Sequence, residues 1–203
     1  MGQISDDELR AIVERIVRRT MGAADPAAMQ PPPSSAVETT KTTDPSPANP
    51  AGANTVAIGC DHGGFDLKEL LKKELEEKGY RVLDCGTDSK EAVDYPDLAE
   101  KVALAVSQGK AWRGICIDGA GIGSCMVANK VPGVRAAMAY DLSSALNSRE
   151  HNDANVLTLG AGLIGINLAK QIMNTWLATE FGGGRHARRI EKIVRVEKTY
   201  LKG

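Results

Sequence analysis

The sequence predicts an α/β fold: a five-stranded parallel sheet covered by helices on both faces, preceded by an isolated amphipathic helix and a disordered linker. Two observations predict it. From residue 55 onward, short runs rich in β-branched residues alternate with segments whose apolar residues recur at helical spacing. Such alternation favours parallel strands joined by helical crossovers. Before residue 55 the composition is different, which separates the globular part from what precedes it.

The chain of 203 residues divides into three regions. We expect residues 1–22 to form a targeting or docking helix, residues 23–54 a flexible linker, and residues 55–203 the globular domain. The linker is rich in Ala, Pro, Ser and Thr and includes three consecutive prolines at 31–33. Such a composition cannot bury a core, so we expect an extended, flexible tether.

The first helix is expected over residues 4–21. Ser5 and Glu8 form a capping box, and apolar residues at 9, 12, 13, 16 and 17 lie on one face. A single helix of this length is marginal in water, so its apolar stripe needs a partner. A capped amphipathic helix on a tether resembles the encapsulation peptides that carry enzymes into bacterial microcompartments. We therefore expect a microcompartment shell or cargo protein as the partner, the alternative being that the helix folds back onto its own domain or oligomer.

The globular domain contains five predicted strands and six predicted helices. The strands are expected at residues 55–60, 81–86, 113–118, 134–139 and 155–160. The helices are expected at residues 65–78, 95–108, about 124–130, 141–150 and 165–179, with a last basic helix starting near Arg185.

The composition excludes several classes of protein. A formal net charge of −1 gives no basic footprint for nucleic acid. No apolar run reaches the roughly 18 residues that a membrane span needs. The four cysteines lack the spacing of a metal site, and three of them lie in or beside apolar runs. We expect buried thiols in a reducing, cytoplasmic compartment.

The strand at 113–118 and the glycine-rich turn after it are the first candidate site. In a parallel α/β sheet, ligands bind outside the carboxyl ends of the strands, where Asp118 stands. The glycines of the turn GAGIG allow backbone amides to approach a ligand oxygen. The alternative is that Asp118 only caps the next helix.

A second glycine pattern, G-x-G-x-x-G, spans residues 160–165. It matches the dinucleotide-binding motif. However, it follows the last strand, and no later strand carries an acidic residue for a ribose. We expect Gly160 to serve a tight turn instead.

All three histidines of the chain lie in polar segments beside predicted strand or helix ends: His62, His151 and His186. A histidine with a pKa near neutrality suits proton transfer, although any one of them is more often structural. Arg185 and Arg189 are four residues apart at the start of the last helix, which suits a phosphate. The alternative there is a solvated basic turn.

Five motifs occur in this order: GCDHGGFDLK, DCGTDSKEAVDYPD, GAGIG with ANKVPGVRAA, REHNDANVL and GGRHARRIEKI. Taken together, they resemble the ribose-5-phosphate isomerase B family, which includes galactose-6-phosphate isomerase subunits. The resemblance covers about residues 55–197. It implies a Rossmann-like three-layer α/β/α sandwich and a homodimer or dimer of dimers with active sites near the subunit interface. It also implies aldose–ketose isomerisation through a cis-enediol, with no metal and no organic cofactor.

The resemblance also assigns roles to individual residues. Asp118 takes the position of the catalytic base, and His151 assists ring opening. The remaining positions bind substrate: Asp61, His62, Tyr95, Gly119, Ala120, Gly121, Ile122, Gly123, Asn152, Arg185, His186 and Arg189. Among these, the amides of residues 119–123 stabilise the enediolate, and the two arginines, with His186, hold the phosphate.

Three positions depart from the family pattern. Asp118 replaces the usual cysteine base, and Ser124 stands where members lacking that cysteine carry a glutamate. A carboxylate is ionised at pH 7 without activation, and we expect partial burial to raise its pKa. Ala120 replaces a threonine that contacts substrate, and Gly162 replaces a basic residue that helps to bind phosphate.

The sequence therefore predicts an aldose–ketose isomerase of a sugar phosphate, with ribose 5-phosphate and ribulose 5-phosphate as the leading pair. The two alternatives are an isomerase of a different, even unphosphorylated, sugar and a non-catalytic sugar-phosphate binding or scaffold protein of a microcompartment.

Overall fold

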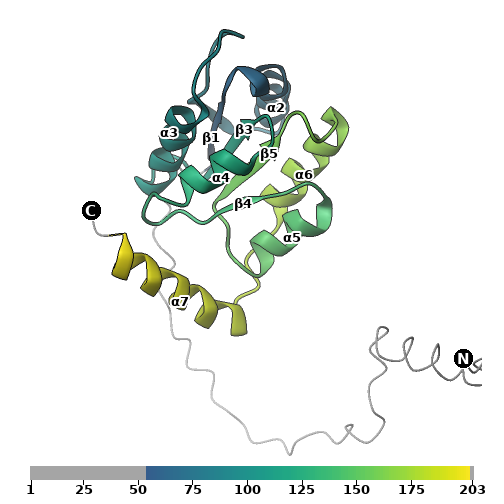
Figure 1. Cartoon of the computed structure of the whole chain (residues 1–203). Helices are drawn as coiled ribbons and strands as arrows, with labels where there is room; N and C mark the ends of the chain where they lie inside the picture. Colours follow the sequence, from purple (N-terminus) through teal and green to yellow (C-terminus); the bar gives the residue numbers. More distant parts are fainter. Residues whose placement is uncertain (1–53, 202–203) are drawn as a thin grey trace, which may run out of the picture. The chain divides into compact units, whose positions relative to one another are not determined.

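The computed structural model describes residues 54–201. The expected helix at 4–21 and nearly all of the expected linker lie outside this range. The described part contains one parallel sheet with the strand order β2-β1-β3-β5-β4 (Figure 1). The five strands are β1 (Thr55–Cys60), β2 (Arg81–Asp84), β3 (Arg113–Asp118), β4 (Ala136–Met138) and β5 (Val156–Gly160). The prediction of five parallel strands is confirmed.

Helices cover both faces of the sheet, as the alternating pattern predicts. Helices α3 and α4 pack on one face, whereas α2, α5 and α6 pack on the other (Figure 1). Their bounds are α2 (Phe65–Glu77), α3 (Tyr95–Ser107), α4 (Ile122–Ala128), α5 (Leu142–Glu150) and α6 (Ile166–Ala178). A short 3₁₀-helix, η2 (His62–Gly64), precedes α2. The apolar core lies in two layers, one on each side of the sheet, so the fold is a three-layer sandwich.

Strand β5 begins one residue later than expected, whereas β2 and β4 are shorter by two and three residues for identifiable reasons. The chain leaves β2 at Asp84 because the carboxylate of that residue accepts the amide of Gly86 and faces the buried ammonium of Lys68. Edge strand β4 covers only three residues. The side chain of Asn129 accepts a hydrogen bond from the Ala136 amide and donates one to the Ala136 carbonyl. These bonds take up the backbone groups at the start of the strand.

Neighbouring strands β1 and β3 form the switch point of the sheet. From β1 the chain crosses to β2 on one side, and the later strands β5 and β4 add on the other side of β3. The turns after β1 and β3 are tied together where the Asp61 amide donates to the Ile117 carbonyl at 3.2 Å. In folds of this type, that position at the carboxyl edge is where ligands bind.

Helix α7 (Arg185–Tyr200) differs from the other helices because none of its residues is buried. It lies apart from the helices that cover the sheet (Figure 1). One hydrogen bond ties it to the body, from the Gly133 amide to Glu197. A groove of about 610 Å³ runs along it, lined by residues that include Phe181, Ile190 and Val194. No helix within residues 54–201 is long and apolar enough to cross a bilayer.

Candidate active site

The turn after β1 places Asp61 and His62 at the carboxyl edge of the sheet. Asp61 caps η2 by accepting the Gly64 amide at 3.1 Å. The imidazole of His62 is exposed, and its Nδ1 lies 3.3 Å from both the amide and the carbonyl of Val93. This contact ties the loop that leads into α3 to the turn after β1, with the Nε2 edge of the ring available to a ligand.

Asp118 ends β3 and is almost fully buried, with 5% of its surface exposed. One carboxylate oxygen accepts the amides of Ala120, at 2.8 Å, and Gly121. The other accepts the amide of Ser124, at 3.0 Å, and its hydroxyl, at 2.5 Å. The carboxylate therefore does cap the start of α4, as one of the two interpretations of the sequence expected.

The expectation that burial raises the pKa of Asp118 is wrong. Burial does act in that direction, but the hydrogen bonds from the Ser124 hydroxyl and from the amides of Gly121, Ser124 and Ala120 together lower the pKa of Asp118. Donors to a carboxylate stabilise its charged form, which is why they outweigh the loss of solvent. Asp118 is therefore ionised at neutral pH and is a weaker base than the sequence led us to expect.

The turn Gly119–Gly123 is shaped by Gly121, which adopts a left-handed conformation with φ of 78°. A Cβ there would stand 2.9 Å from the backbone of Leu159, so this position requires glycine. The buried hydroxyl of Thr158 fixes the same turn by donating to the Gly121 carbonyl at 2.8 Å. Because the Ala120 and Gly121 amides already donate to Asp118, those of Gly119, Ile122 and Gly123 are the candidates for a ligand oxygen.

Tyr95 is the first residue of α3, and its ring lies against Gly123. A Cβ on Gly123 would come within 2.7 Å of the Tyr95 hydroxyl. The phenol is partly exposed beside the turn, with 39% of its surface accessible. The structure thus brings Asp61, Tyr95 and Asp118 to one edge of the sheet.

The G-x-G-x-x-G pattern packs against this turn. A Cβ on Gly160 would lie 2.6 Å from the Ala120 carbonyl oxygen, and the Gly162 amide donates to the Gly119 carbonyl at 3.0 Å. Two strand-end loops can approach this closely only if side chains are absent. These glycines therefore serve the packing of one loop on another, in agreement with the expected role of Gly160 in a tight turn.

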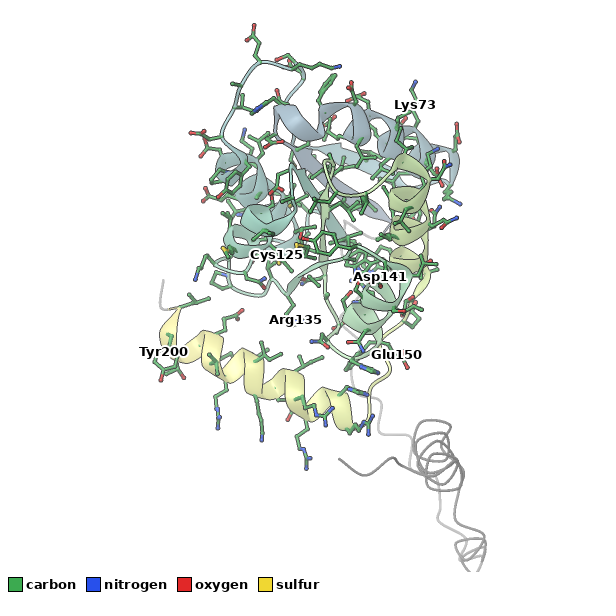
Figure 2. All side chains as sticks on the ribbon, turned by 45° about the vertical axis from the view of Figure 1, so that its right-hand side comes forward. Lys73, Cys125, Arg135, Asp141, Glu150 and Tyr200 are labelled. Atoms are coloured by element: carbon green, nitrogen blue, oxygen red, sulfur yellow. The ribbon has the colours of Figure 1, made fainter. Side chains whose placement is uncertain are left out.

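The second group of predicted residues lies at the opposite, amino edge of the sheet. Helix α5 runs back from the carboxyl edge, and His151 caps its C-terminal end (Figure 2, where Asp141 and Glu150 mark the two ends of α5). Nδ1 of His151 lies 2.8 Å from the amide nitrogen of Asn147. The ring stacks on His186 with centroids 4.2 Å apart and planes 5° from parallel. Asn152 follows as an exposed residue.

The first turn of α7 adds Arg185 and Arg189 to the two histidines. Burial and the neighbouring positive groups of His151, Arg185 and Arg189 lower the pKa of His186, against the weaker opposite effect of Glu150. Nδ1 of His186 is buried and has no hydrogen-bond partner within residues 54–201. A cluster that gathers cationic groups and leaves a polar atom unpaired is suited to an anion such as a phosphate.

Within one chain the two groups are not brought together. Asp61, His62, Tyr95, Asp118 and residues 119–123 follow the carboxyl ends of strands, whereas His151, Asn152, Arg185, His186 and Arg189 lie where α5 and α6 return to the amino edge. The sequence predicts one site, but the described residues of a single chain form two separate groups, which we call candidate half-sites.

Sequence reasoning missed residues that shape both half-sites. Ser124 was noted only as the place of an absent glutamate, yet its hydroxyl bonds Asp118. Arg149 is buried and binds Asp153 and the Ala154 carbonyl, both at 2.7 Å, which fixes the end of α5 beside His151. An arginine among apolar positions of α5 was the available signal; for Ser124 there was none, because its partner is set by the turn.

The globular part of the chain is similar to known proteins. A family model described as Ribose/Galactose Isomerase matches residues 56–193. Ribose-5-phosphate isomerase B of Escherichia coli is 46% identical over 143 residues, covering 70% of this chain and 96% of that protein. D-erythrulose-4-phosphate isomerase of Pectobacterium atrosepticum is also 46% identical over 140 residues, covering 68% and 92%.

Solved structures agree in the arrangement of the chain. The ribose-5-phosphate isomerase B of Clostridium thermocellum is 51% identical, with a TM-score of 0.71, covering 72% of this chain and 99% of that one. A Mycoplasma genitalium ribose-5-phosphate isomerase B with bound ribulose 5-phosphate is 40% identical, with a TM-score of 0.69, covering 71% and 96%. The expected Rossmann-like three-layer fold is confirmed.

Proposed function

Since this chain belongs to the Ribose/Galactose Isomerase family, we propose that it is an aldose–ketose isomerase that interconverts ribose 5-phosphate and ribulose 5-phosphate. The reaction moves one proton between neighbouring carbons through a cis-enediolate. It needs a base close to the reacting carbons and donors for the enediolate oxygen. The single observation that carries the proposal is the buried, ionised carboxylate of Asp118 at the carboxyl end of β3, followed directly by the glycine-rich turn 119–123.

The proposed base is Asp118, in the position where the family resemblance implies a cysteine. Its lowered pKa means that it needs no activation at neutral pH, at the expense of basicity. The amides of Gly119, Ile122 and Gly123 are the proposed donors to the enediolate oxygen. Asp61, His62 and Tyr95 line the same edge and are proposed to hold the sugar hydroxyls.

The proposed phosphate site is the cationic cluster at the start of α7. Arg185 and Arg189 supply forked donors, and His186 supplies an unpaired ring nitrogen. His151 is proposed to open the furanose ring, with Asn147 holding its Nδ1. Asn152 lies next to it and is proposed to contact the substrate.

The two half-sites support a homodimer, or a dimer of dimers, in which each active site combines residues of two copies. One chain presents the base and the other presents the phosphate cluster. The apolar side chains that α7 leaves exposed agree with this arrangement, because Ile193 and Val196 keep 45% and 53% of their surface accessible. A two-fold axis repeats such a composite site twice.

The proposed function is tested with purified protein and a panel of sugars. We expect conversion of ribose 5-phosphate to ribulose 5-phosphate without added metal or organic cofactor. Binding of the sugar phosphate without any conversion would favour the alternative of a non-catalytic binding or scaffold protein.

A different sugar is the second candidate substrate. Ala120 lacks a hydroxyl, and Gly162 lacks the cation that the family resemblance implies for phosphate binding. A relative at 46% identity is named for D-erythrulose 4-phosphate. Higher kcat/KM for a four-carbon sugar phosphate, or for an unphosphorylated sugar, than for ribose 5-phosphate would make that sugar the preferred substrate.

For residues 4–21 we propose docking onto a microcompartment shell or cargo protein, the enzyme being otherwise cytoplasmic. Fusing residues 1–22 to a fluorescent protein should co-localise it with that partner. A fusion with the apolar residues 12 and 16 changed to glutamate is the matched control. A wild-type fusion that stays diffuse in the presence of the partner would contradict the proposal.

A further inference from the structure

The hydrogen bonds of Asp118 limit how a proton can reach it. A carboxylate offers about four lone-pair positions to donors. In Asp118 all four have a donor: the amides of Ala120 and Gly121 on one oxygen, and the amide and hydroxyl of Ser124 on the other. Because all four positions are filled, Asp118 can take up a proton only if one of these donors gives way. Burial does not separate Asp118 from Ser124, since they are 5% and 2% exposed.

Three of the four donors are held in place by the backbone. The turn that carries them is fixed by the left-handed Gly121 and by the bond from the Thr158 hydroxyl to the Gly121 carbonyl. An amide N–H cannot accept a proton in exchange for the one it donates. The Ser124 hydroxyl can, because it is both donor and acceptor and its hydrogen rotates freely. Ser124 is therefore the one group among the four that can exchange a proton with Asp118.

We propose that Ser124 is a catalytic residue that relays the proton between the substrate carbon and Asp118, an inference that rests on the proposed isomerase function. The Ser124 oxygen takes the proton from C2 of the aldose while its own hydroxyl proton moves to Oδ2 of Asp118. The electron pair of the broken C2–H bond forms the C1=C2 double bond, and the C1 carbonyl oxygen takes the negative charge.

The second half of the reaction reverses the relay on the neighbouring carbon. The O2 hydroxyl proton moves to O1, so that the charge lies on O2. The Ser124 proton then goes to C1 as the proton on Asp118 returns to the Ser124 oxygen. The carbonyl forms at C2, and both side chains regain their starting protonation states.

The contacts favour a relay over direct transfer to Asp118. The hydroxyl oxygen of Ser124 lies 2.5 Å from Oδ2, so a proton travels a short way between them. Direct transfer would require either an amide of the turn to release Asp118 or the Ser124 hydroxyl to turn away from Oδ2. If transfer were direct, removing the hydroxyl would free a lone pair on Asp118 and leave the reaction intact. The two routes therefore predict opposite effects of Ser124→Ala.

The test compares kcat and KM for ribose 5-phosphate in the wild-type protein, Ser124→Ala and Asp118→Asn. The relay predicts that both variants lose about 10²-fold or more in kcat, with KM close to that of the wild type. Thr87→Val is the matched control, because it removes another buried hydroxyl, whose hydrogen bonds are to Ser89 in the loop after β2 and not to the turn or to Asp118. We expect this control to retain most of the wild-type kcat.

Isotope effects separate a relay from a purely structural role. A substrate deuterated at C2 and a D2O solvent should slow the same step in the wild type, because a carbon-bound and a hydroxyl proton move together. D-erythrose 4-phosphate suits this measurement, since its phosphorylated O4 prevents ring closure. Ser124→Cys, which keeps a proton-exchanging group, should recover part of the kcat and serves as the second variant if Ser124→Ala does not fold.

Each outcome decides between the possibilities. A Ser124→Ala variant with wild-type kcat overturns the relay alone and leaves Asp118 as a direct base. A C–H isotope effect on a step that D2O leaves unchanged overturns it as well. A wild-type protein that converts neither ribose 5-phosphate nor D-erythrose 4-phosphate overturns the proposed function, and the relay with it.

Discussion

At the scale of single residues, His151 offers a test of its proposed role that depends on the substrate. Ribose 5-phosphate is mostly a closed furanose ring, whereas a four-carbon sugar phosphorylated at O4 stays in the open-chain form. His151→Ala should lower kcat/KM for ribose 5-phosphate by about 10²-fold or more, since general acid–base catalysis of ring opening is lost. The loss for D-erythrose 4-phosphate should be much smaller. Steady-state kinetics on both sugars check this, and equal losses would assign His151 another role.

The lowered pKa of Asp118 also has a consequence for stability. The pKa of Asp118 is lower in the folded protein than in the unfolded chain, where an aspartate has a pKa near 4. Such a group stabilises the fold fully at pH values above the unfolded-state pKa. That contribution is lost as the pH falls through the folded-state pKa. Asp118→Asn, which loses acceptor positions for buried donors, should therefore cost about 2 kcal/mol or more at pH 7, and less below pH ~4.

Urea unfolding at pH 7 and pH 3 measures this change in the free energy of unfolding. Asp88→Asn is the matched control, because Asp88 is exposed. A penalty for Asp118→Asn that is the same at both pH values would mean that the amides do not stabilise the charged form.

At the scale of elements, the contact between the loops after β3 and β5 predicts the effect of a single methyl group. Gly160→Ala would place a Cβ 2.6 Å from the Ala120 carbonyl oxygen. We expect it to destabilise the fold by about 1–3 kcal/mol through overpacking and to lower kcat by displacing the turn. Gly165→Ala is the matched control, since a Cβ there meets no atom within 4 Å.

Thermal unfolding and isomerase kinetics of both glycine variants check this prediction. If Gly160→Ala kept wild-type stability and activity, the close loop contact would not constrain the site. If the wild-type protein bound a nicotinamide or flavin dinucleotide and Gly160→Ala abolished that binding, the glycine pattern would be a dinucleotide-binding motif and not a packing feature.

An ion pair between a buried lysine and a partly exposed carboxylate joins α2 to the end of β2. The ammonium of Lys68, whose side chain is 2% exposed, lies 2.8 Å from Asp84, and it also donates to the Thr87 carbonyl at 3.0 Å. Lys68→Met should cost about 1–3 kcal/mol, because it leaves the Thr87 carbonyl without its buried donor. Asp84 keeps Lys72 and the Gly86 amide as partners. Lys72→Met removes a second, 30% exposed ammonium from the same carboxylate and should cost less than about 1 kcal/mol.

Denaturant unfolding of the two lysine variants checks the difference. Equal costs would show that Lys68 acts as a surface charge does. The same ion pair explains why β2 is shorter than the sequence predicts. The strand-like run continues to Cys85, but Asp84 pairs with Lys68 of α2, a contact that the local sequence does not reveal. In contrast, β3 has its predicted bounds, because all of its determinants are local: a buried apolar run and the glycine turn after it.

At the scale of the whole molecule, the sequence predicts the layers, the parallel sheet and most of the residues that the site needs. These features are predictable because hydrophobic periodicity and glycine-containing turns are encoded by residues close together in the sequence. That His151 and Asp118 stand at opposite edges follows from the parallel sheet, because α5 must return to the amino edge before β5 begins. The sequence does not predict that His186 of α7 stacks on His151, because that contact depends on tertiary packing. It also gave the wrong pKa direction for Asp118, because four donors assemble around that carboxylate only when the turn folds.

The unburied α7 completes this account of the molecule. A helix with no buried residue contributes little to the stability of its own chain. A second copy of the chain would explain both of its features. That copy would cover the apolar residues of α7 and would use the cationic first turn to complete its own active site. We therefore expect the proposed enzyme to be active only as an assembly, in which the other copy completes each half-site.

The most direct test of this claim is complementation between two inactive variants. One carries Asp118→Asn, and the other carries Arg185→Ala together with Arg189→Ala. Half of the randomly formed dimers contain one chain of each kind, and a composite site leaves one of their two sites intact. The account predicts that each variant alone is inactive and that co-expression restores about a quarter of the wild-type activity. A mixture as inactive as its parents, although it forms mixed dimers, would contradict it.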